Sequence, residues 1–127
     1  MTLADSNVFI AYFRLNEAIH KKARKLISSL DEIIINDYVL SEIYTVLMLR
    51  ESYDIAHQAL MWITRNPKIR IERLTNKEIK SIVSFIEKNT TKLSFVDISL
   101  LVMSKNRNYQ LLSFDRDLNF KNQSREC

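Results

Sequence analysis

Apolar residues recur along this chain with two different periods, and the change from one period to the other predicts its architecture. Recurrence every three or four residues indicates helices, whereas short β-branched runs such as residues 33–35 indicate buried strands. The pattern predicts helices at residues 8–13, 17–30, 38–50, 53–64, 75–88 and 94–105. It predicts strands at residues 3–7, 33–35, 69–74 and 110–114, and the alternation within 69–74 predicts one covered face for that strand. Asp37 is expected to cap the helix at residues 38–50.

Strands that alternate with helices predict right-handed βαβ units and an α/β fold with a mostly parallel sheet. The chain has 127 residues, which fits a single domain over residues 1–127. Helix 94–105 is apolar nearly all round, so we expect it to be deeply packed. No apolar run reaches the ~18 residues that a membrane span needs, so we expect no membrane partner.

The composition excludes several classes of site. Glycine is absent, which excludes the glycine-rich phosphate loops of nucleotide-binding folds. Asparagine is the next best residue at positive φ, so we expect helices to stop at Asn66, Asn89, Asn106 and Asn108. The one cysteine, Cys127, excludes an internal disulfide and fits a reducing, cytoplasmic compartment. The formal net charge of +4 is compatible with a nucleic-acid partner but does not demonstrate one.

Four acids stand where polar residues are unexpected or where strands end. Asp97 lies inside an almost wholly apolar run, Asp5 and Asp115 follow predicted strands, and Glu42 lies at the edge of a helical apolar arc. A buried carboxylate is costly unless a cation compensates it. Because the carboxyl ends of parallel strands meet at one edge of a sheet, the four acids can converge there. Carboxylates without histidine or cysteine favour Mg²⁺ or Mn²⁺ over Zn²⁺.

Each acid also has a purely structural interpretation. Ser94 and Asp97 have the spacing of a capping box, so Asp97 could simply cap its helix. Asp115 could be a turn residue, Asp5 could cap the following helix, and Glu42 could reach solvent from the flank of its helix. The four structural interpretations would all have to hold at once, and this favours the functional interpretation.

The sequence around these acids resembles the PIN-domain ribonucleases. Asp5, Ser6 and Asn7 resemble the opening D-T-N motif of that family, and Glu42, after Leu40 and Ser41, resembles its second acidic motif. The stretch from Leu93 to Asp97 resembles the third motif. The stretch from Leu112 to Leu118 resembles the fourth, [ST]-F-D-x-D-F. The resemblance covers nearly the whole chain, and the size is most similar to VapC-like toxins of type II toxin–antitoxin pairs.

The resemblance implies a PIN-like three-layer α/β/α sandwich with a four- or five-stranded sheet and a metal-dependent endoribonuclease activity. Asp5, Asp97 and Asp115 would hold one or two Mg²⁺ or Mn²⁺ ions. Glu42 would be a further ligand or would orient the attacking water, and the products would carry 5′-phosphate and 3′-hydroxyl ends. Candidates for contacting the substrate or supporting the ligands are Asn7, Ser94, Ser113, Arg116 and Asp117.

The resemblance also implies partners: an RNA substrate, a second copy of the chain in a homodimer, and a small antitoxin that blocks the acidic site. Two alternatives keep the fold, namely a housekeeping RNA-processing nuclease without an antitoxin and a catalytically inactive binding module. A phospho-receiver domain also places acids at strand ends. That fold would need a second acid next to Asp5, and the sequence has none there.

Overall fold

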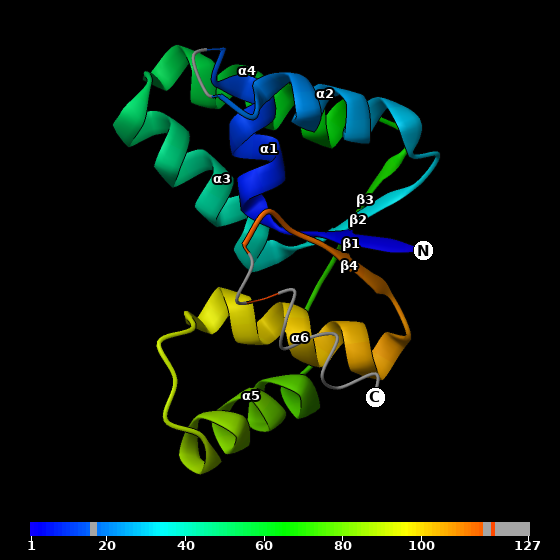
Figure 1. Cartoon of the computed structure of the whole chain (residues 1–127), viewed down its shortest axis with the longest axis vertical. Helices are drawn as coiled ribbons and strands as arrows, with labels where there is room; N and C mark the ends of the chain where they lie inside the picture. The colour runs from blue at the N-terminus through cyan, green and yellow to red at the C-terminus, as the bar shows by residue number, and fades with distance from the viewer. Residues whose placement is uncertain (16–17, 116–117, 119–127) are drawn as a thin grey trace.

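The computed structural model of the chain describes residues 1–15, 18–115 and 118, and a parallel sheet lies at its centre (Figure 1). The strands are β1 (Thr2–Ala4), β2 (Ile33–Asn36), β3 (Ile69–Glu72) and β4 (Gln110–Leu112). Their order across the sheet is β3-β2-β1-β4, and each pairing among the described residues is parallel. The predicted α/β fold with a parallel sheet is therefore confirmed.

Helices cover both faces of this sheet. They are α1 (Ser6–Phe13), α2 (His20–Ser29), α3 (Asp37–Arg50), α4 (Tyr53–Arg65), α5 (Asn76–Lys88) and α6 (Phe95–Arg107). Helices α5 and α6 lie on one side of the sheet and the other four lie on the opposite side (Figure 1). This arrangement is the three-layer sandwich that the resemblance implies.

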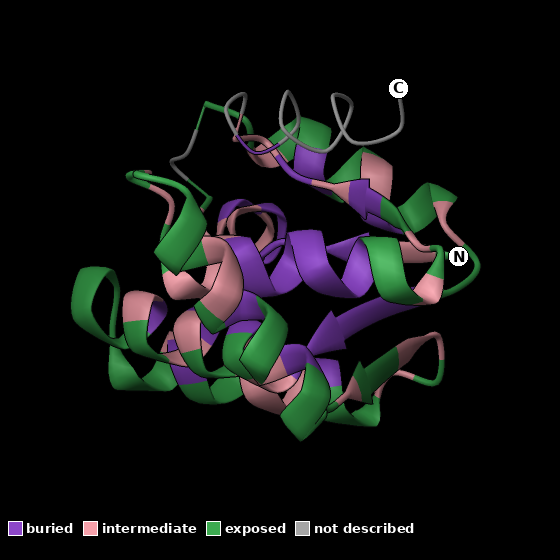
Figure 2. Ribbon diagram, turned by 90° about the horizontal axis from the view of Figure 1, so that it is seen from below, coloured by how far each residue is buried: buried purple, intermediate pink, exposed green. Residues whose placement is uncertain are grey.

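The core follows the two most apolar segments. All four residues of β2 are buried, and α6 is buried without interruption over residues 98–104 (Figure 2). Asn36, at the end of β2, lies inside this core and donates from Nδ2 to the Ser99 hydroxyl at 3.0 Å. A satisfied polar pair of this kind fixes the position of α6 against the sheet, since misalignment would leave buried polar atoms unpaired. The prediction that helix 94–105 is deeply packed is confirmed.

Two local predictions are wrong. We expected Asp37 to cap helix α3, but the cap is Asn36, whose Oδ1 accepts from the Val39 amide at 2.8 Å, and Asp37 is the first helical residue. We also expected strand 69–74 to have one covered face. Instead β3 ends at Glu72 and Ile71 is 38% exposed, because β3 is the edge strand of the sheet.

Three of the four predicted asparagines end helices, but only one of them does so at positive φ. Asn108 ends α6 in the left-handed conformation, with φ 55° and ψ 46°. Asn66 and Asn89 end α4 and α5 with extended backbones. Asn106 lies inside α6, so its predicted role as a helix stop is wrong.

A fifth edge strand, which the resemblance would place after Asp117, falls outside the described residues. Within the described part of the chain, no helix combines the length and the apolar character that crossing a membrane requires.

Candidate functional site

The four predicted acids lie around one edge of the sheet. Asp5 directly follows β1, and its backbone amide donates to the Leu112 carbonyl at the end of β4, at 2.9 Å. Asp115 lies three residues after Leu112 in the sequence. Glu42 is in the second turn of α3, and Asp97 is in the first turn of α6. Glu42 and Asp97 are near enough to Asp5 for their charges to affect its ionisation, so the structure brings these three acids together.

Asp5 is the most enclosed of these acids, with 4% of its surface exposed. Its Oδ1 accepts from the Ser6 amide at 2.7 Å, which makes Asp5 the N-cap of α1. Its Oδ2 accepts from the Ser113 hydroxyl at 2.8 Å, which joins the ends of β1 and β4. The capping interpretation of Asp5 is therefore correct, but it does not account for the burial of the second oxygen beside other acids.

The pKa of Asp5 is raised to about 6. Burial is the largest cause, and the charges of Asp97 and Glu42 also contribute. Hydrogen bonds from Ser113 and Ser6 act in the opposite direction but do not outweigh burial. A carboxylate in this position is held among like charges with little solvent. A bound cation would remove that penalty.

Ser6 links two of the acids and was not singled out from the sequence. It is buried, and its hydroxyl donates to Glu42 Oε1 and lies 3.4 Å from Asp5 Oδ1. Glu42 is only half-buried, so this contact turns its carboxylate toward Asp5 and away from solvent. In the sequence, the position of Ser6 between Asp5 and Asn7 was the one indication that it could contact the acids.

Asn7 and Ser113 support the loop that carries Asp115. Asn7 donates from Nδ2 to the Ser113 hydroxyl at 3.2 Å and accepts the Phe114 amide at its Oδ1, also at 3.2 Å. The Ser113 hydroxyl in turn accepts the Asp115 amide at 3.0 Å. These contacts place Asn7 and Ser113 as supports of the acids, one of the two roles that the sequence suggested. Arg116 and Asp117 lie outside the described residues.

Asp97 takes part in the capping box that its spacing predicted. Its Oδ2 accepts the Ser94 amide and its own amide donates to the Ser94 hydroxyl, each at 3.1 Å. Capping does not exclude ion binding, because a carboxylate has about four acceptor sites on two oxygens. Ser94 serves as the partner in this cap.

The acids fit a hard divalent cation by their chemistry. Their donors are all carboxylate oxygens, which suit Mg²⁺ or Mn²⁺, and such ions usually keep several waters. Among the described residues, no three acidic, histidine or cysteine side chains are close enough to form a complete ligand set by themselves. Water would therefore have to complete the coordination.

The raised pKa of Asp5 gives a prediction for the metal-free protein. Since the folded-state pKa is about 6 and the ordinary value is about 3.9, folding costs about 3 kcal/mol more above pH 6 than below pH 4. Asp5→Asn removes that penalty but weakens the contact with Ser113, at about 1 kcal/mol. We expect the variant to be more stable than the wild type by about 1–2 kcal/mol near neutral pH, measured by urea unfolding in EDTA.

The same experiment has two internal checks. The advantage of Asp5→Asn should disappear toward about pH 4, where both proteins have a neutral group at this position. Saturating Mn²⁺ should stabilise the wild type more than the variant. A variant less stable than the wild type at neutral pH would contradict the charge burial described above.

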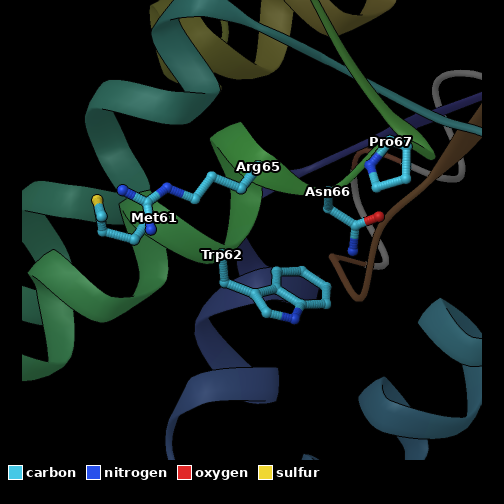
Figure 3. A pocket seen from close by; sticks show the side chains of 5 residues that line it. All are labelled: Met61, Trp62, Arg65, Asn66 and Pro67. Carbon is cyan, nitrogen blue, oxygen red and sulfur yellow. The ribbon is translucent and has the colours of Figure 1, made fainter.

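A hollow at the C-terminal end of α4 is separate from these acids in sequence and in its lining residues. Its volume is about 470 Å³, and its lining residues are Met61, Trp62, Arg65, Asn66 and Pro67 (Figure 3). The Trp62 ring stacks on Tyr12, with centroids 4.9 Å apart. Trp62 therefore packs α4 against α1.

Comparison with known proteins gives one family and a set of similar folds. The family model that matches is described as the PIN domain, and it matches residues 2–124. Curated proteins give no sequence match.

Solved structures share the fold at low sequence identity. VapC20 of Mycobacterium tuberculosis, described as a sarcin-ricin loop cleaving toxin, is 22% identical, with 95% of each chain covered and a TM-score of 0.88. FitAcB from Neisseria gonorrhoeae is 14% identical, with 97% of this chain and 94% of that chain covered and a TM-score of 0.71. VapBC2 from Rickettsia felis, bound to a DNA fragment from its promoter, is 11% identical, with coverages of 94% and 91% and a TM-score of 0.67.

Proposed function

This chain belongs to the PIN domain family, and from that premise we propose that it is a metal-dependent endoribonuclease, the toxin of a type II toxin–antitoxin pair. The observation that carries the proposal is the buried Asp5 carboxylate, whose ionisation is opposed by Asp97 and Glu42. Such a concentration of negative charge has no evident use in folding. It has a direct use in holding a cation against a phosphodiester.

In phosphodiester hydrolysis, each of these residues would have a separate role. A bound divalent cation would neutralise charge on the phosphate and lower the pKa of a bound water. Asp5, Asp97 and Asp115 would hold it, directly or through water. Glu42, held by the Ser6 hydroxyl, would orient the attacking water. Asn7 and Ser113 would keep Asp115 in place.

Cleavage of an RNA pool by the purified chain tests this proposal. We expect cutting with Mg²⁺ or Mn²⁺, none with EDTA, and recovery when the metal is added back, because the carboxylates alone cannot stabilise a phosphate that carries negative charge. The 5′-phosphate and 3′-hydroxyl ends of the products would be identified by their response to ligase and phosphatase. Cutting that persists undiminished in EDTA would contradict the proposal and point to a contaminant or to another mechanism.

The toxin assignment rests on likeness to toxins and toxin–antitoxin complexes of known structure, including one from Klebsiella pneumoniae that is 15% identical with a TM-score of 0.64. We propose a small antitoxin partner that presents a basic side chain to the acids, within one cytoplasmic PIN-like domain over residues 1–127. A second copy of the chain would cover the exposed apolar residues Met48, Leu49 and Tyr53, where α3 turns into α4. A housekeeping nuclease would show the same cleavage with no antitoxin encoded beside it.

A further inference from the structure

Helix α2 carries an exposed basic face of a kind that no other described helix has. The helix is the sequence HKKARKLISS, with no acid in it. Ala23 and Ile27 are buried against the protein, and the opposite face is exposed. That face lines a hollow of about 860 Å³ made by Lys21, Lys22, Arg24, Lys25, Ser28 and Ser29.

Among residues 1–15, 18–115 and 118, no carboxylate forms an ion pair with any of these four cations. Lys22 lies over the Phe114 ring and Arg24 over the Tyr12 ring, contacts that leave their positive charges uncompensated by an acid. Two basic residues near the sheet edge, by contrast, are engaged within the protein. Lys68 donates to the Ile27 carbonyl at 2.5 Å, and Arg70 pairs with Glu32 and Glu72. A second group of basic residues, formed by Arg65, Lys68, Arg70, Arg73, Lys77 and Lys80, is thus partly engaged within the protein.

The basic face of α2 begins beside the acids. The Lys22 ammonium lies 5.5 Å from the centre of the Phe114 ring. Phe114 stands between Ser113, which donates to Asp5, and Asp115. The first turn of α2 is therefore next to the loop that carries Asp115, one of the proposed metal ligands.

The charges on these two surfaces are complementary to different parts of one substrate. An RNA strand is a polyanion, so four clustered carboxylates would repel it except at the one phosphate next to a bound cation. Phosphates further along the strand need a separate cationic surface. From residue 21 to residue 29 the basic face extends about 12 Å, enough for on the order of three phosphates at helical spacing.

We infer that the exposed face of α2 binds the phosphate backbone of single-stranded RNA beside the scissile bond. This inference rests on the proposed nuclease function and names where its substrate is held. Lys21, Lys22 and Lys25 contact phosphates, and Ser28 and Ser29 offer hydroxyl donors one turn further along. A homodimer through this face is disfavoured, since a two-fold axis would place cations against cations.

Binding, measured without cleavage, tests the inference. The probe is a labelled single-stranded RNA of about 16 nucleotides, and the protein carries Asp97→Asn so that the RNA stays intact. Affinity is measured between about 50 and 200 mM salt for this protein and for the same protein with Lys21→Gln, Lys22→Gln and Lys25→Gln. Glutamine keeps helix propensity, so the exposed substitutions should leave the fold intact, and circular dichroism checks this.

We expect the triple variant to bind about tenfold more weakly, with a salt slope smaller by about 2, because each phosphate contact of a single strand contributes about 0.7. The matched control is Lys77→Gln, Lys80→Gln and Lys88→Gln on α5, which makes the same charge change on the opposite side of the sheet. An equal loss in the control would show a general charge effect and overturn the inference. Unchanged RNA binding in the α2 variant would overturn it too, as would a loss confined to binding of a protein partner.

Failure of this inference can be told from failure of the proposed function. The wild type is tested for metal-dependent cutting in a separate assay. Metal-dependent cutting with α2-independent binding would reject the inference alone. RNA binding that depends on α2 without any cutting would reject the nuclease and leave α2 as an RNA-binding surface.

Discussion

Asp97→Asn is expected to reduce RNA cleavage at least ~10³-fold while leaving the fold intact. A divalent cation stabilises transition-state charge by several kcal/mol, and each ~1.4 kcal/mol is a factor of ten in rate. Asp97 is one of the three proposed carboxylate ligands of the cation, so its removal should abolish most of this stabilisation. Asparagine keeps an oxygen that can accept the Ser94 amide, so the capping box of α6 is largely retained. Single-turnover cleavage at saturating Mn²⁺ measures the effect.

The control for this experiment is Asp54→Asn. Asp54 is also in the first turn of a helix, where α4 begins after a serine cap at Ser52, but it is exposed and lies on another helix. Both variants lose one negative charge beside a helix N-terminus, which costs about 0.3–1 kcal/mol of stability in each. If Asp97 were only a cap, the two variants would cleave equally well. A large loss confined to Asp97→Asn separates the catalytic interpretation from a general effect of removing a negative charge from the first turn of a helix.

The sequence predicts the positions of the acids well because their location follows from topology. The ends of parallel strands meet at one edge of a sheet, so the positions of Asp5 and Asp115 follow as soon as β1 and β4 are recognised. The depth of α6 follows from its apolar character on every face. These are properties of single segments, and a single sequence contains them.

Contacts between distant segments could not be predicted in the same way. The Ser6–Glu42 contact joins residues 36 positions apart, and it depends on how α3 packs against α1. The periodicity of α3 gives the face on which Glu42 lies but not which hydroxyl meets it. The basic residues of α2 were visible in the sequence, but their nearness to Asp115 depends on the packing of Lys22 over Phe114.

The cap of α3 shows a different limit. Asn36 and Asp37 are both good N-cap residues, and their intrinsic preferences are nearly equal. Asn36 takes the position because its amide group can donate to Ser99 while its oxygen caps the helix. An aspartate could not donate that bond, so the tertiary contact decides between two residues that local preference leaves equal.

The second large effect is expected at Arg107, at the C-terminal end of α6. Its guanidinium contacts Glu72 Oε1 at 2.8 Å, Glu78 Oε2 at 3.0 Å and the Arg73 carbonyl at 2.8 Å. It therefore joins α6 to the edge strand β3 and to the first turn of α5. Burial opposes ionisation of Glu78, but hydrogen bonds from Arg107 and Thr75 outweigh it and hold the pKa of Glu78 below its usual value.

Arg107→Met should destabilise the protein by about 3 kcal/mol, because removing one partner leaves the buried Glu78 carboxylate without its cation. Methionine fills a similar volume, so little of the loss comes from packing. For a chain of this size we expect the melting temperature to fall by roughly 10 °C. The matched control is Arg70→Met, which removes ion pairs to Glu32 and Glu72 from a side chain that is 49% exposed. Exposed pairs contribute about 0–1 kcal/mol, so this variant should melt within a few degrees of the wild type.

The pH dependence of the Arg107 effect gives an independent check of its cause. A carboxylate whose folded-state pKa is lowered adds stability above its ordinary pKa, and that stability is lost as the pH falls through the folded-state value. The gap between Arg107→Met and the wild type should therefore be largest near neutral pH and should narrow in acid, where Glu78 becomes protonated in both proteins. A gap that stays constant down to acid pH would show that Arg107 acts through packing of its aliphatic stem. The ionic link between α6, β3 and α5 would then have no measurable part in holding the sandwich together.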